Sequence, residues 1–335
     1  MPKSRWSFPE RIFFAAAVVV GVVLLWQLTE VLVLVFGAIV IATVVRGLAR
    51  RLERWLGLST HAAGIAGTLS IMGVLGLAIW LVGGALTHQV DQLRQSIPDA
   101  WNAASAWLES RPLGRQFLQV IEDAGQSGLS GARLAGVAGT ALGAVGTGVL
   151  MLIVGVYLAL DPALYRQGVL NLTPPGCRSR LANALEASGH GLSRWLLGQA
   201  ASMVFLGSST ALGLWVLDVP LAMVLGFVTG LLAFVPFFGS IAAGALATLL
   251  GFTAGPEKAL HVALLFLALQ QVEDYLLQPI VQRWAVAIPP VLTMLSALIF
   301  GILFGIVGIV FATPMMVVVM IMVRKLYVED VLEAR

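Results

Sequence analysis

Long apolar runs separated by short polar segments dominate the chain. Residues 12–28, 31–45 and 62–86 are apolar, and after a polar stretch the apolar pattern resumes up to Asp161. A membrane-spanning helix needs ~20 apolar residues to cross ~30 Å of hydrocarbon, where the backbone must satisfy its own hydrogen bonds. We expect the first two runs to form a tight helical hairpin that turns at Glu30, and the third run to be a full span. No cleaved signal peptide is expected, because the second apolar run follows the first almost at once.

The C-terminal half contains two apolar segments that are interrupted in the middle. Residues 220–254 and 289–323 align so that Pro220 falls on Pro289 and Gly239 falls on Gly308. The interruptions are Pro236-Phe237-Phe238-Gly239 and Gly305-Ile306-Val307-Gly308, with Pro314 further along the second segment. Each arm has ~15 residues, or ~22 Å of helix, which is short for a full span. We therefore predict two re-entrant hairpins whose breaks line a cavity within the membrane. The alternative is a set of about ten short full spans.

The polar stretch after the third span has helical periodicity. Its apolar positions fall into two stripes, Val90, Leu93, Ile97, Trp101, Ala104 and Leu108, and then Phe117, Leu118 and Ile121. Such a pattern is typical of amphipathic helices that lie on a bilayer or on a partner subunit. A small helical cap that packs on itself fits the pattern equally well.

These patterns together predict an all-α polytopic membrane protein. We expect about six full transmembrane helices, two re-entrant hairpins and an amphipathic extramembrane segment. The predicted divisions are N-terminal transmembrane helices (1–88), an extracytoplasmic amphipathic segment (89–136), a transmembrane helix (137–162), a cytoplasmic basic segment (163–199), a C-terminal transport core with both hairpins (200–323) and a cytoplasmic tail (324–335).

The composition supports a membrane protein and excludes other classes. The chain is 59% hydrophobic and only 11% charged, whereas about a quarter of the residues are charged in soluble domains. A net charge of +3 without a basic run argues against nucleic-acid binding. The single cysteine, Cys177, cannot form an internal disulfide, and no His or Cys spacing suggests a metal site. No cofactor is expected.

The basic residues predict the orientation. If the N-terminus is cytoplasmic, 15 of the 20 Lys and Arg residues lie inside, including a loop formed by residues 46–54. The other five, among them Lys258, lie outside. We therefore predict that both termini are cytoplasmic.

The sequence from Gln270 to Pro279 is the best candidate for a functional site. Gln270, Gln271, Glu273 and Asp274 follow an apolar helix, and ionisable groups at such positions usually face a cavity, a partner or a proton path. Burial favours the protonated form of a carboxyl group, so the pair is a candidate for ion coupling. The alternative is that this end of the helix is solvated, or paired with Arg283. Gln199 is a second candidate at the start of a predicted span, and the interpretation that the sequence favours there is an interfacial Trp and a polar helix end.

Several motifs resemble the autoinducer-2 exporter family of bacterial permeases. They are Trp195-Leu-Leu-Gly-Gln199, Pro236-Phe-Phe-Gly239, the stretch from Gln270 to Pro279, Pro289, Gly301-Ile-Leu-Phe-Gly-Ile-Val-Gly308 and Ala312-Thr-Pro314. Ala233 departs from the pattern, because many relatives carry Asn there, which weakens the transfer of a ligand role to this position. The resemblance implies an inner-membrane exporter of small polar metabolites or quorum-sensing signals that forms a homo-oligomer, for example a pentamer. It also implies cation/proton antiport for some relatives.

Three functions are consistent with these features. The first is export of a small polar solute coupled to H⁺ or Na⁺, and the second is cation/proton antiport by the same acids. The third is a passive oligomeric channel or a membrane scaffold. An enzyme is not expected, because the chain has no Gly-x-Ser-x-Gly motif and no metal-binding pair of histidines.

Overall fold

The computed structural model describes residues 27–57, 59, 62, 64–70, 72–73, 96–111, 114–116, 118–119, 131–279 and 288–332. These ranges contain helices and no β-strand, which confirms the predicted all-α class. The longer helices are α2 (Thr29–Leu56), α5 (Gly131–Leu160), α6 (Pro162–Asn171), α7 (Arg178–Val216), α8 (Ala222–Leu232), α9 (Phe238–Gly251), α10 (Pro256–Val272) and α12 (Pro290–Val323). Short turns η1 (Pro175–Cys177), η2 (Phe252–Ala254), η3 (Glu273–Leu277) and η4 (Arg324–Leu332) connect or extend them, and residues 64–70 and 96–109 are also helical.

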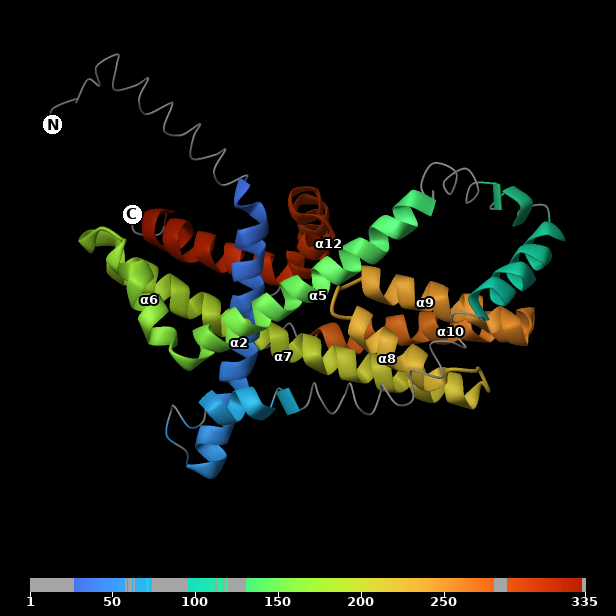
Figure 1. The fold of residues 1–335 in the computed structure, drawn as a ribbon, viewed down its shortest axis with the longest axis horizontal. Helices are drawn as coiled ribbons and strands as arrows, with labels where there is room; N and C mark the ends of the chain where they lie inside the picture. Colours follow the sequence, from blue (N-terminus) through green and yellow to red (C-terminus); the bar gives the residue numbers. More distant parts are fainter. Residues whose placement is uncertain are drawn as a thin grey trace, which may run out of the picture.

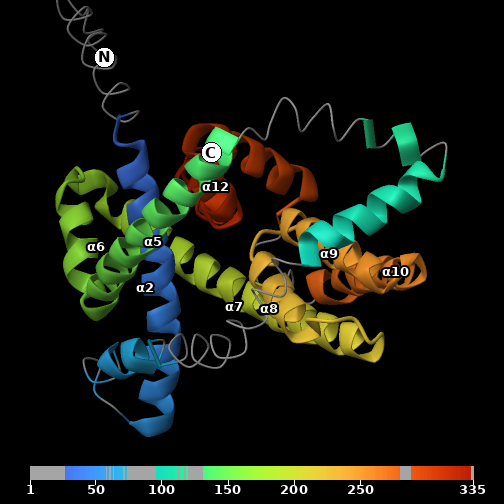
Figure 2. The ribbon, with the colours of Figure 1, turned by 45° about the vertical axis from the view of Figure 1, so that its right-hand side comes forward.

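The helices α7, α8, α9 and α10 run alongside one another (Figure 1). An apolar core between them contains Leu214, Leu225, Leu250 and Val262, all almost fully buried. The helix α2 crosses α7 and lies to one side of α8, α9 and α10, as both views show (Figures 1 and 2). A second core joins the two parts, because Val40 of α2 packs with residues of α7 and α12.

The crossing of α2 and α5 is close because small residues lie at the contact. A Cβ added to Gly155 of α5 would come within 2.9 Å of the Ala38 carbonyl and of Ile41 in α2. Val33, Met151 and Met315 are buried at this contact and connect α2 and α5 to α12. Glycine therefore sets how near the two apolar helices approach.

Among the described residues, four helices are long and apolar enough to cross a membrane. They are Thr29–Leu56, Pro175–Val216, Pro256–Leu277 and Pro290–Glu329, and a fifth span results if the bent pair Gly146–Leu160 and Pro162–Asn171 is one span. The chain is thus a multi-pass membrane protein. The run 12–28 lies outside the described residues except for Gln27 and Leu28, and so does most of 62–86.

Two predictions near α2 are wrong. Glu30 lies within the first turn of α2, so the chain does not reverse at this residue. An acidic side chain is favourable there because the N-terminal end of a helix carries partial positive charge. Residues 46–54 form the last turns of the same helix instead of a loop, and α2 ends where Gly57 adopts a left-handed conformation (φ 64°). The helix continues because nothing in the arginine-rich stretch breaks it.

Both predicted breaks in the C-terminal half are breaks in helices. The first separates α8 from α9 at residues 233–237, where Phe237 has a φ of 66°. The second lies inside α12 at Gly305, whose φ of 65° and ψ of −149° interrupt the helical backbone. The chain also breaks at Asp218-Val219-Pro220, which separates α7 from α8, with left-handed backbone at Asp218 and Leu221.

The two aligned glycines, Gly239 and Gly308, have the same structural role. A Cβ on Gly239 would overlap the carbonyl of Leu232, and a Cβ on Gly308 would overlap the carbonyl of Phe300. In each hairpin the second arm therefore folds back closely on the end of the first arm. The predicted similarity of the two segments extends to this contact.

The helix at residues 96–109 packs on the core of the same chain. Ala100 is buried among the residues between α7 and α10, and the Trp107 ring lies 5.6 Å from that of Phe252. Ile97 and Trp101, which belong to the predicted apolar stripe, are exposed. Ala104 of the same stripe is buried and Leu108 is half-buried, whereas Val90 and Leu93 lie outside the described residues. Most of the second stripe lies outside the described residues.

Candidate functional site

The polar stretch that ends α10 contains a change of helix type. The helix α10 ends at Val272, and residues Glu273–Leu277 form a π-helical turn closed by the Gln278 N–H donating to the Glu273 carbonyl. Extra residues of this kind within an α-helix occur frequently at functional sites. The turn begins at the predicted carboxylate pair.

Gln270 connects the two acids. Its side-chain amide nitrogen lies 3.2 Å from the Asp274 Oδ1 and 3.5 Å from the Glu273 Oε2. Glu273 is buried, with only 8% of its surface exposed, whereas Asp274 is half-buried. The predicted grouping of Gln270, Glu273 and Asp274 on one face is therefore observed, and Gln271 is exposed. The alternative partner Arg283 lies outside the described residues.

The carboxylate of Glu273 faces the break of the first hairpin. The Ser240 hydroxyl, in the first turn of α9, lies near it. The N-terminal end of a helix carries partial positive charge, which favours a carboxylate at this place. The contact joins α10 directly to the residue that follows the predicted break Pro236–Gly239.

The opposite side of the same break is held by α7. The side-chain amide of Gln199 donates to the carbonyl of Ala233, the residue that ends α8. One turn earlier the Trp195 ring packs edge-on against Phe234, with 6.0 Å between the ring centroids. A helix end leaves carbonyls without intrahelical partners, so Gln199 satisfies one that would otherwise be stranded. Ala233 is the position that departs from the family pattern, and its backbone carbonyl, not its side chain, makes the contact with Gln199.

The break therefore lies between the Gln199 side chain of α7 and the Glu273 carboxylate, which directly follows α10. Gln199 and Glu273 are each 17 residues, or ~25 Å of helix, from the ends of α7 and α10 that lie near Asp218 and Pro256. At that shared end Lys258 donates to the Leu217 carbonyl and lies 3.8 Å from Asp218. A polar group of this kind beside a helix break can hold a proton, a cation or a small polar solute.

The second hairpin does not share this polar group. Phe304 and Val307, on either side of Gly305, pack against α2 and α5. Its second arm reaches the first break through apolar contacts, because Val317 and Phe311 cluster with Trp195 and Phe234. The three prolines that the sequence singled out lie at different places. Pro289 precedes the first turn of α12, and Pro314 is buried within the second arm of that helix. Pro279 is the last residue of the polar stretch.

Sequence reasoning missed two contributors to the site. Ser240 immediately follows the break glycine, and a hydroxyl at the first turn after a predicted break was a usable signal. Phe234 was part of the apolar background, and its contact with Trp195 depends on tertiary packing that no local pattern encodes.

Comparison of the sequence with known proteins identifies its family. The model of the AI-2E family transporters matches residues 12–327. The "Putative transport protein MT0215" of Mycobacterium tuberculosis is 28% identical over 332 residues, which cover 93% of this chain and 87% of that protein. The "Putative transport protein YrrI" of Bacillus subtilis is 30% identical over 166 residues, which cover 50% of this chain and 47% of that protein. Since the family match extends from the first apolar run to the tail and includes both broken hairpins, the chain belongs to the AI-2E family of transporters.

Proposed function

We propose that this chain is a secondary transporter that exports a small polar metabolite or signalling molecule, such as autoinducer-2, across the bacterial inner membrane, coupled to H⁺ or Na⁺. Membership of the AI-2E family supports transport as the role. The observation that supports coupling is the buried Glu273, which lies near the Ser240 hydroxyl at the break of the first hairpin.

The contact between Glu273 and Ser240 gives coupling a physical form. An ionised carboxylate can only accept the hydroxyl hydrogen bond, and this charge-assisted bond ties α9 to α10. A proton or a bound cation on Glu273 removes that charge from the bond and weakens the tie. The first arm stays attached to α7 through Gln199, so loading Glu273 loosens the hairpin on one side. In the proposed cycle this movement opens the break to the solute.

Asp274 and Gln270 complete the proposed site. Two carboxylates that lie beside one amide bring two negative charges together, so a cation bound there would offset their repulsion. The Gln270 amide then offers a donor and an acceptor to a polar solute. Antiport of a cation against protons would use the same acids without an organic solute.

The test is flux through the full chain in proteoliposomes with an imposed pH gradient. We expect autoinducer-2 efflux to follow the gradient in the wild type, and to lose this dependence in Glu273→Gln, which keeps the shape but cannot ionise. The matched control is Glu257→Gln, because Glu257 is an exposed acid in the first turn of the same helix. Ser240→Ala removes the hydroxyl that forms the tie, so this variant should also lose the dependence on the gradient.

The other outcomes identify the alternatives. Proton movement that requires a cation and no solute would mean antiport, and efflux that ignores the gradient would mean a passive channel. Wild-type coupled flux in Glu273→Gln would refute the role of the carboxylate. Metabolite profiling of medium from cells with and without the protein would identify the solute.

A further inference from the structure

The helix α6 leaves the bundle at a right angle to α5. The two helices are bent by 87° at a break of a single residue, Asp161. Pro162 occupies the first turn of α6, and the Asp161 carboxylate accepts a hydrogen bond from the Leu164 N–H at 3.2 Å. Both features start a new helix, so the bend is specified by local sequence. If α5 crosses the bilayer, α6 runs along its surface.

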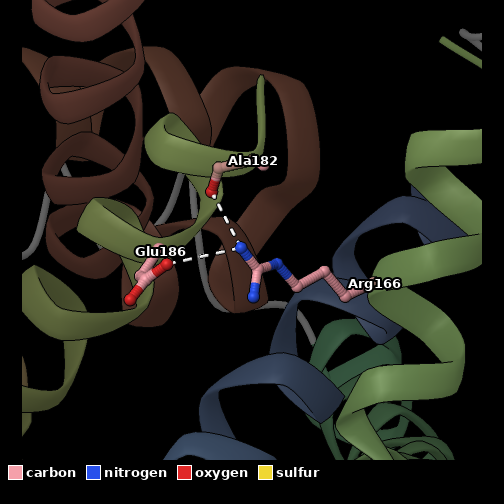
Figure 3. Close-up of polar contacts among 3 residues, drawn as sticks. All are labelled: Arg166, Ala182 and Glu186. Carbon is pink, nitrogen blue, oxygen red and sulfur yellow. Dashed lines mark hydrogen bonds and ion pairs between the residues drawn. The ribbon is translucent and has the colours of Figure 1, made fainter. Parts of the chain in front are cut away.

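One side of α6 is attached to α7. The Arg166 guanidinium lies 3.3 Å from the Glu186 carboxylate and 3.4 Å from the Ala182 carbonyl (Figure 3). Arg178 closes the turn between the two helices by donating to the Thr173 carbonyl at 3.0 Å. These contacts fix which face of α6 is turned toward α7 and which is turned away.

The face turned away is apolar and exposed. It carries Leu164, Tyr165, Val169 and Leu172, and Leu172 is 89% exposed. At ~100° per residue these side chains fall on one side of the helix, and Arg166 falls on the other. No residue of α6 is buried. An apolar stripe of this kind is a liability in water.

The charge around this stripe is positive. Between Asp161 and Glu186 the chain has three arginines, Arg166, Arg178 and Arg180, and no acidic residue. Arg166 pairs with Glu186, and Arg178 and Arg180 are exposed in the first turn of α7. Arginines next to an apolar helical face match the headgroups of anionic lipids.

We propose that α6 is an interfacial helix that binds the surface of an anionic bilayer, with Leu164, Tyr165, Val169 and Leu172 in the acyl boundary and Arg178 and Arg180 at the phosphates. A lipid surface fits better than a second copy of the chain, because an exposed apolar stripe followed by two exposed arginines matches hydrocarbon beside anionic headgroups. The inference depends on membrane location and is independent of Glu273 and of the transported solute.

The single cysteine makes the test direct. In a Cys177→Ser background, Leu172→Cys places a fluorescent label on the apolar face, and Gln167→Cys places the matched control on the exposed polar side. The labelled full chain is reconstituted in phosphatidylcholine vesicles with and without phosphatidylglycerol. Quenching by nitroxide lipids reports contact with the bilayer, and quenching by aqueous iodide reports contact with water.

We expect lipid quenching and iodide protection for Leu172→Cys, and the reverse for Gln167→Cys. Lipid quenching of Leu172→Cys should fall without phosphatidylglycerol, and should lose this lipid dependence when Arg178→Gln and Arg180→Gln are added. Iodide quenching of both labels would refute the proposal by placing α6 in water. Protection from both quenchers would refute it by placing protein over α6. Equal lipid quenching in both vesicle types would refute the role of the arginines.

Discussion

At the scale of residues, the site depends on a few polar side chains that stabilise irregular backbone. Gln199 and Ser240 both contact the first break, one from each side, and neither is charged. Neutral donors hold a helix break in an apolar bundle without the cost of a buried charge. The charge is concentrated in Glu273 and Asp274, where ion coupling is proposed.

Replacing Gln199 by alanine should destabilise the protein. The substitution leaves the Ala233 carbonyl without its donor, and a buried polar group left unpaired costs about 1–3 kcal/mol. The loss should appear as a lower melting temperature of the detergent-solubilised protein. Gln271→Ala is the matched control. Gln271 is an exposed glutamine of α10, so its replacement should change the stability little. Equal melting temperatures for Gln199→Ala and the wild type would show that the bond contributes nothing.

At the scale of elements, two helical hairpins share one device for reversing direction. Gly239 and Gly308 each lie against a backbone carbonyl of the preceding arm. Backbone cannot move aside as a flexible side chain can, so these positions exclude any Cβ. The rest of each hairpin tolerates ordinary apolar residues, which explains why the two segments share few identities.

Alanine at either glycine should disrupt its hairpin. Overpacking typically lowers the stability by about 1–3 kcal/mol. Because the added Cβ would overlap backbone atoms, Gly239→Ala and Gly308→Ala should each lose about 3 kcal/mol or more. The control is Gly148→Ala in α5, where an added Cβ meets nothing within 4 Å and alanine should favour the helix. Melting temperature and yield of folded protein would separate them. Similar values for all three variants would contradict the proposed close approach.

Local sequence signals predicted the breaks well and the continuity of helices less well. Proline and glycine mark Pro236–Gly239, Gly305 and Asp218–Pro220, because these residues act on the backbone itself. In contrast, α7 continues through Gln199 without a break, although polarity changes there and suggested a boundary. A change from polar to apolar sequence indicates that the helix passes from one environment to another, and it does not end the helix. The arginines at the end of α2 illustrate the same point.

The site was predicted in part for similar reasons. Gln270, Glu273 and Asp274 are near in sequence, so helical spacing sufficed to group them. The approach of Ser240 and Gln199 to the same break depends on how α7, α9 and α10 pack, and residues more than thirty positions apart leave no periodic signal. The second break, aligned with the first, packs on α2 and α5 instead of on the acids.

At the scale of the whole molecule, the two hairpins have different surroundings. The first lies between α7 and α10 and has polar contacts on both sides of its break. The second contacts α2 and α5 through aromatic and aliphatic side chains. The two meet where Phe234 and Trp195 pack with Val317 and Phe311. This apolar contact is where movement of one hairpin would displace the other.

Helix lengths lead to a topology that can be tested with single cysteines. The helices α8 and α9 have 11 and 14 residues, or ~16 and ~21 Å, against ~30 Å of hydrocarbon. We therefore expect the first hairpin to enter and leave on the same side. The wild-type Cys177 is exposed and should react with an impermeant maleimide from the cytoplasmic side, as the excess of basic residues there predicts.

Two further positions decide between a re-entrant hairpin and short spans. In the Cys177→Ser background, Thr253→Cys at the exposed end of α9 should react from the outside, since α7 lies between it and Cys177. Phe238→Cys at the break is half-exposed and should react from that same outer side, more slowly because it lies deeper. Reaction of Phe238→Cys from the cytoplasmic side alone would mean that α8 and α9 are full spans. Such a bilayer would have to be thinned around the hairpin, because neither helix alone is long enough to cross it.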